Sequence, residues 1–125
     1  MDAQQILDTV KQQYGITFTE TQTGGGCMAL EARLESGHWI VATDDALSGF
    51  ARRIEFESRD DNYNSHYSDD HCAMGWSIGI YPNDPAENTW MSGEDSIVDI
   101  VDYDAYAHQL PGIVGAALKA LMEVR

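Results

Sequence analysis

Large apolar and small residues alternate from Met74 to Ile80 in one stretch of the chain, which reads Met74-Gly75-Trp76-Ser77-Ile78-Gly79-Ile80-Tyr81. Successive side chains of a β-strand point to opposite faces of the sheet, so the large apolar residues share one face and the glycines lie on the other. The pattern predicts a strand with one deeply buried face. Because glycines bring no side chains to their face, we expect that face to be bare or closely covered by a neighbour.

Three further strands are predicted upstream of this stretch. Alternation and β-branched residues mark each of them, and glycine-containing turns at 24–26 and 35–37 separate them. Their predicted ranges are 16–23, 27–34 and 38–43. Short turns join consecutive antiparallel strands, so we expect these strands to form a meander.

The middle of the chain is more polar and carries fewer apolar patterns. Apolar and charged residues alternate in 52–57, which predicts a fourth strand after a short helix or turn over 44–50. The almost wholly polar segment 58–71 is predicted to be a long exposed loop. In 96–103, isoleucines and valines are interleaved with aspartates. That periodicity fits either a strand or a helix, and a strand is favoured.

Helices are predicted at both ends of the chain. Apolar residues recur at helical spacing in 2–14, and Gly15 is a natural stop signal. Pro111 suits the first turn of a final helix that runs to Val124. Together the elements predict a single α+β domain over residues 1–125. We expect a mainly antiparallel sheet of about five strands, with the N- and C-terminal helices packed on one of its faces.

The charge of the chain is its strongest compositional feature. Asp and Glu number 21 against 7 Lys and Arg, which gives a formal net charge of −14. No Lys or Arg occurs between Asp60 and Leu118. A surface of this sign repels nucleic acid and anionic membranes and attracts basic proteins. We therefore expect neither direct nucleic-acid binding nor membrane binding.

The chain shows no targeting signal and little use of cysteine. It has no apolar run of about 18 residues, and its first residues lack the basic and apolar regions of a secretory signal. We therefore expect a cytoplasmic protein, in which Cys27 and Cys72 remain thiols.

We predict that the carboxylates of two acidic segments bind a basic nucleic-acid-binding protein or complex. Strand residues rise about 3.3 Å each, close to the roughly 3.4 Å per phosphate along one DNA strand. Spaced carboxylates therefore suit imitation of a nucleic-acid backbone. The predicted partner-binding residues are Asp60, Asp61, Asp69, Asp70, Glu94, Asp95, Asp99, Asp102 and Asp104. The same composition would suit a halophilic or simply well-solvated protein, and that alternative stays open.

The main alternative function is that of a metal-binding protein or a metal-dependent enzyme. His66, His71 and Cys72 lie close to Asp69 and Asp70, and imidazole, thiolate and carboxylate are the ligand types of Zn²⁺. The cluster has neither a Cys-x-x-Cys pair nor a His-Glu-x-x-His motif. No nucleophile signature surrounds either cysteine. We accordingly predict no catalytic residues, no cofactor and a function that is not enzymatic.

A resemblance to known proteins begins at the first glycine turn. The segment Thr23-Gly24-Gly25-Gly26-Cys27-Met28-Ala29-Leu30, followed later by Trp39-Ile40-Val41-Ala42-Thr43-Asp44, resembles a pattern in small phage and prophage proteins of unassigned function. The resemblance implies genomic company with phage genes. Small acidic proteins in that company are often inhibitors of host defence, including anti-CRISPR proteins. The resulting hypothesis is a phage-encoded stoichiometric inhibitor with a surface that mimics nucleic acid.

Overall fold

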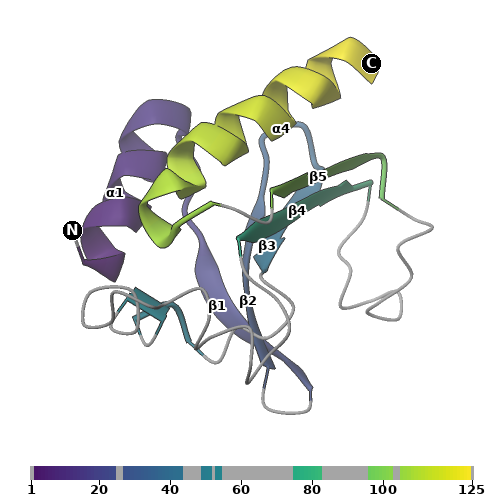
Figure 1. Ribbon diagram of the computed structural model, residues 1–125. Coiled ribbons are helices and arrows are strands. Elements are labelled where there is room, and N and C mark those ends of the chain that lie inside the picture. Colours follow the sequence, from purple (N-terminus) through teal and green to yellow (C-terminus); the bar gives the residue numbers. More distant parts are fainter. Residues whose placement is uncertain are drawn as a thin grey trace.

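A five-stranded antiparallel sheet with two helices on one side forms the protein (Figure 1). The computed structural model describes residues 2–24, 27–43, 49–51, 53–54, 75–82, 96–102 and 105–124. The strands follow one another in space in the order of the sequence, as a meander. The elements are α1 (Ala3–Tyr14), β1 (Thr19–Gly24), β2 (Cys27–Arg33), β3 (Trp39–Thr43), β4 (Trp76–Tyr81), β5 (Val98–Asp102), the short 3-10 helix η2 (Ala107–Gln109) and α4 (Leu110–Val124). The predicted α+β fold is confirmed.

Local capping signals determine where α1 begins and ends. The Asp2 side chain accepts a hydrogen bond from the Gln5 backbone N–H at 2.8 Å, and the Asp2 N–H donates to Gln5 Oε1 at 2.8 Å. This reciprocal pair is a capping box. At the other end Gly15 takes the left-handed conformation, with φ of 70°, and its N–H donates to the Lys11 carbonyl. The predicted stop at Gly15 is confirmed.

The core lies between the sheet and the two helices. Ile78 of β4 is paired with Ala42 on one side and with Ile100 on the other, so apolar side chains run across the sheet in rows. The helices contribute buried residues such as Val10 and Val114 to the same cluster. The opposite face of β4 carries Gly79, and a Cβ placed there would lie 3.0 Å from the Tyr81 hydroxyl oxygen. The glycine face is therefore closely covered at Gly79.

The predicted strand over 52–57 is wrong where the structure describes it. Phe50, Ala51, Arg53 and Ile54 are helical, and the Arg53 N–H donates to the Gly49 carbonyl four residues earlier at 3.1 Å. Phe50 and Arg53, three residues apart, are buried on one side of this helical turn. Their burial against the sheet outweighs the alternation of the sequence.

The remaining strand predictions differ mainly at their ends. β1 begins at Thr19 and not at Ile16, although Ile16 and Phe18 are buried ahead of it. The favoured strand in 96–103 is confirmed as β5, which is paired with β4 from Val98 to Asp102. The predicted loop over 58–71 lies outside the described residues.

Arg53 is the one charged residue that is buried within the described ranges, at 1% exposure. Its guanidinium donates to the Gly75 carbonyl at 2.6 Å and to the Ala105 carbonyl at 3.0 Å. It also lies over the Trp76 ring, 4.4 Å from the centroid. The Trp76 indole N–H in turn donates to the Tyr106 carbonyl at 3.1 Å. One side chain thus joins the helical turn after Gly49, the start of β4 and the chain ahead of α4.

We predict that Arg53→Met lowers the free energy of unfolding by about 2–4 kcal/mol, because two buried carbonyls lose a charged donor. The free energy of unfolding of Arg53→Lys should lie between those of Arg53→Met and the original protein, since one ammonium group cannot reproduce the two-pronged donor geometry of the guanidinium. Urea unfolding followed by tryptophan fluorescence measures both. Arg33→Met is the matched control, because Arg33 is exposed and should change stability by about 0.5 kcal/mol or less. Equal effects at the two arginines would contradict the role given to Arg53.

Candidate functional site

Two of the predicted partner-binding carboxylates, Asp99 and Asp102, lie within the described part of the chain. Both are exposed and both belong to β5, which is an edge strand of the sheet. The other predicted members lie outside the described residues, namely Asp60, Asp61, Asp69, Asp70, Glu94, Asp95 and Asp104. The structure therefore places the C-terminal acidic segment, in part, at one edge of the sheet.

The two β5 carboxylates do not share a face. Asp99 is paired with Gly79 and Asp102 with Trp76, and side chains three residues apart on a strand point to opposite faces. Asp102 is on the face that carries the helices, and Asp99 is on the opposite one. The two carboxylates therefore flank the edge of the sheet, one from each side, instead of forming a row along one face.

Apolar side chains accompany Asp99 on its face. Ile97 and Val101 are two residues away on either side and are 41% and 49% exposed, respectively. The Asp99 carboxylate accepts a hydrogen bond from the Ser96 hydroxyl at 2.6 Å. A hydroxyl is a neutral donor, so this bond orients the carboxylate without cancelling its charge. The edge offers a negative charge with apolar surface on both sides of it.

The residues of the predicted metal site, His66, His71 and Cys72, lie outside the described residues. Within the described ranges no group of three or more His, Cys, Asp or Glu side chains is placed to hold a metal ion. The metal alternative from the sequence therefore stays a prediction.

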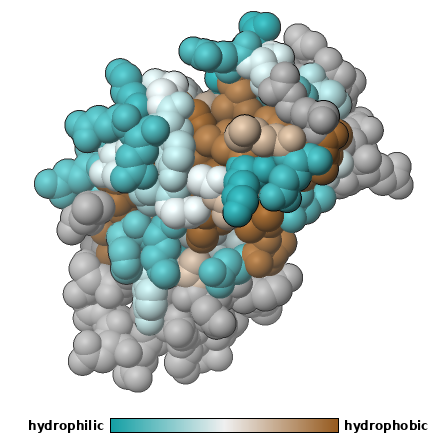
Figure 2. All heavy atoms as spheres, turned by 90° about the horizontal axis from the view of Figure 1, so that it is seen from above, coloured by the Kyte–Doolittle hydropathy of each residue, from teal (hydrophilic) through white to brown (hydrophobic). Residues whose placement is uncertain are grey.

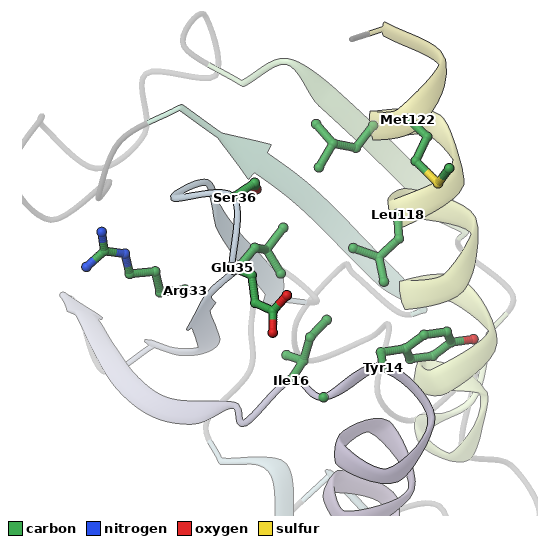
Figure 3. A pocket seen from close by; sticks show the side chains of 10 residues that line it. Tyr14, Ile16, Arg33, Glu35, Ser36, Leu118 and Met122 are labelled. Carbon is green, nitrogen blue, oxygen red and sulfur yellow. The ribbon is translucent and has the colours of Figure 1, made fainter.

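A pocket that the sequence analysis did not find lies at the end of the sheet where α1 stops (Figure 3). Its volume is about 310 Å³, at the lower end of the range for small-molecule sites. Three segments that are distant in sequence line it: Tyr14 to Ile16 at the end of α1, Arg33 to Ser36 at the turn between β2 and β3, and Leu118, Leu121 and Met122 of α4.

The α4 wall of the pocket is apolar and partly open to solvent. Met122, which lines the pocket, is 75% exposed. In Figure 2, apolar surface gathers over α4 between hydrophilic areas. Tyr14 closes the wall from the α1 side, because Gly115 leaves room for its ring: a Cβ at Gly115 would lie 3.1 Å from Tyr14 Cζ. The contact between the two helices therefore shapes the pocket.

The turn between β2 and β3 is held by its own hydrogen bonds. The Leu34 N–H donates to the His38 carbonyl at 2.7 Å, and the Gly37 N–H donates to the Leu34 carbonyl at 2.9 Å. Gly37 has a φ of 92°, which suits glycine. The Ser36 hydroxyl and His38 Nδ1 form a further hydrogen bond at 2.6 Å. These bonds fix the backbone that carries Glu35.

The side chains of Glu35 and Arg33 point in different directions relative to the pocket. Figure 3 shows the Glu35 carboxylate turned toward Ile16, among the lining side chains, whereas the Arg33 guanidinium points away from them. The pocket therefore presents an inward carboxylate with both polar and aliphatic residues around it. The lining residues come from segments that are far apart in the sequence, so no local sequence pattern predicts the pocket.

Comparison with protein-family models, with curated proteins and with solved structures finds no match for this chain. The resemblance at Thr23–Leu30 therefore stays a prediction.

Among the described helices, none has the length and apolar character needed to cross a membrane.

We predict that Gly112→Ala and Gly115→Ala separate helix propensity from the shape of the pocket. A Cβ at Gly112 meets nothing within 4 Å, so alanine should raise stability by about 0.5–1 kcal/mol. Gly115→Ala has the same propensity gain but displaces the Tyr14 ring, so its net gain should be smaller. Urea unfolding gives the stabilities, and the NMR signals of the Tyr14 ring report its displacement. Equal stabilisation with unmoved Tyr14 signals would contradict the packing described.

Proposed function

We propose that this protein is a stoichiometric inhibitor, which occupies the basic groove of a nucleic-acid-binding protein with an acidic, nucleic-acid-mimicking surface. The observation that carries the proposal is the exposure of Asp99 and Asp102 at the edge of the sheet, within a stretch from Asp60 to Leu118 that contains no Lys or Arg. Such a surface attracts basic grooves over a distance and repels nucleic acid itself.

The placement of Arg53 supports the proposal. Its charge lies inside the protein, where it is shared with the Gly75 and Ala105 carbonyls. The charge of Arg53 therefore forms no part of the exposed surface. Elsewhere in the described residues, Asp2 and Asp8 are exposed and accept hydrogen bonds from neutral amide groups, which leave their charge in place.

The apolar neighbours of Asp99 also support binding to a protein groove. Ile97 and Val101 flank the carboxylate on its face of β5. The side chains of Lys and Arg combine a cationic head with an apolar stem. A carboxylate between two aliphatic side chains complements both parts, which a uniformly polar surface would not.

The finer identity of the partner rests on the resemblance to phage and prophage proteins at Thr23–Leu30. On that basis we propose that the protein is phage-encoded and that its partner is a component of bacterial defence, as for an anti-CRISPR protein. The cytoplasm of the infected cell is then the place of action. No turnover is required, because occupancy alone blocks the groove.

The proposal predicts capture of a basic nucleic-acid-binding protein from bacterial lysate at about 0.1 M salt and its release at about 1 M, where the Debye length falls from about 10 to 3 Å. The released partner should bind labelled DNA or RNA. Addition of this acidic protein should then displace the labelled nucleic acid from the partner in a one-to-one ratio. Capture that is indifferent to salt, or a captured partner that keeps its nucleic acid, would overturn the proposal.

A matched pair of variants tests whether β5 takes part. Asp99→Lys with Asp102→Lys should weaken displacement of the label by about tenfold or more, because like charges then face the groove. Asp8→Lys with Glu123→Lys makes the same change in net charge at exposed helix positions and should have a much smaller effect. Circular dichroism checks that both variants are folded. Equal losses would show that only the total charge matters, and an unchanged β5 variant would move the interface elsewhere.

Metal analysis of the freshly purified protein separates the metal alternative from this proposal. An inhibitor that acts through charge should carry no stoichiometric zinc, and His71→Ala should leave capture unchanged. Stoichiometric zinc that is lost in His71→Ala would place the metal function first.

A further inference from the structure

The pocket at the end of α1 combines apolar walls with negative electrostatic character. Five of its lining residues are aliphatic or carry a thioether: Ile16, Leu34, Leu118, Leu121 and Met122. The Glu35 carboxylate is turned inward among them (Figure 3). Glu35 belongs to the hydrogen-bonded turn between β2 and β3, so the backbone of this residue is already positioned before a ligand binds.

The end of α1 adds to the negative character of the pocket. The last residue of α1, Tyr14, and its cap, Gly15, both line the cavity. The carbonyl end of a helix carries a partial negative charge, equivalent to about half an elementary charge, and favours cations in its neighbourhood. Glu35 and the end of α1 therefore act in the same direction.

Among the described residues, the lysines of α1 and α4 lie outside the pocket lining, and the Arg33 guanidinium points away from it. Lys11 and Lys119 are exposed on α1 and α4 and do not line the pocket. Arg33 lines it, but its guanidinium points outward. Within the lining, the Glu35 carboxylate is therefore turned toward the pocket, and the Arg33 guanidinium is turned away from it.

The chemistry of the walls selects the ligand. An inorganic cation would gain nothing from the aliphatic side chains, and a purely apolar group would desolvate the Glu35 carboxylate without replacing its hydrogen bonds. A long apolar stem that ends in a cation satisfies both. The cavity volume of about 310 Å³ is suited to one such group and not to a large ligand.

We propose that this pocket binds the side chain of one lysine or arginine of the basic partner, with the stem against Leu118 and Met122 and the cation at Glu35. The identity of the occupant as a partner residue rests on the proposed function; the affinity of the pocket for a cationic side chain does not. The pocket is thereby a second contact, formed by different residues from those at the β5 edge.

The test uses two small probes and methyl NMR of the whole protein. N-acetyl-lysine amide and N-acetyl-norleucine amide have the same stem, and only the first ends in a cation. With methyl-labelled methionine and leucine, the lysine probe should give saturable shifts at Met122, Leu118 and Leu121. The norleucine probe should bind at least twofold more weakly, since exposed ion pairs contribute up to about 1 kcal/mol, or about fivefold in affinity.

Glu35→Gln should weaken the lysine probe two- to fivefold and remove the preference for lysine over norleucine. Glu123→Gln is the matched control, because it makes the same change in net charge on α4 and Glu123 does not line the pocket. Unequal effects of the two variants support the site. Equal affinities for the two probes, equal effects of the two variants, or lysine-probe shifts that leave Met122 unmoved would overturn it.

The probe experiment and the nucleic-acid displacement assay fail independently. If the lysine probe binds at Met122 in a Glu35-dependent way while no captured partner loses its nucleic acid, the pocket stands and the mimicry is wrong. If displacement occurs and Glu35→Gln and Glu123→Gln bind the lysine probe equally, the mimicry stands and the pocket proposal is wrong.

Discussion

The structure depends on the placement of one guanidinium. Arg53 donates to the carbonyls of Gly75 and Ala105, which belong to segments 22 and 52 residues away in the chain. Without Arg53 both buried carbonyls would lose a charged hydrogen-bond donor, and an unsatisfied buried carbonyl lowers the stability of the fold. The contact with Trp76 completes the cluster, and the Trp76 ring also packs against Phe50 in a T-shaped arrangement, with 5.6 Å between the ring centroids. It aligns the start of β4 with the approach to α4, and the position of α4 in turn sets the pocket wall.

The fold was predictable where local signals decide it. The alternation that predicts a strand over 74–81 and the stop at Gly15 each depend on a few neighbouring residues. The structure confirms the strand from Trp76 to Tyr81, and it confirms the stop. The error at 52–57 has a different origin. Alternation there is genuine, but the helical turn at Phe50 and Arg53 is stabilised by contacts with Trp76 and Ala105, which lie far away in sequence. No periodicity within the segment reports such contacts.

The candidate site was predictable in charge but not in geometry. Composition shows the acidic stretch, yet only the register of β5 against β4 shows that Asp99 and Asp102 lie on opposite faces. Because β5 bears one carboxylate on each face, a partner can contact both carboxylates only along the edge of the sheet. The pocket was beyond sequence reasoning for a further reason: Glu35, Tyr14 and Met122 are brought together by the packing of the two helices and a hairpin turn.

The distribution of charge connects stability with binding. Carboxylates such as Asp99 are exposed, where water screens them, while the Arg53 guanidinium is buried and donates its hydrogen bonds to backbone carbonyls. A net charge of −14 nevertheless repels itself in the compact state more than in the expanded one. A basic partner of the kind proposed would reduce that repulsion most in the folded form, because the unfolded chain does not hold the carboxylates in the same arrangement. Mutual stabilisation therefore follows from linkage: whatever affinity the partner has for the folded form adds directly to the stability of that form.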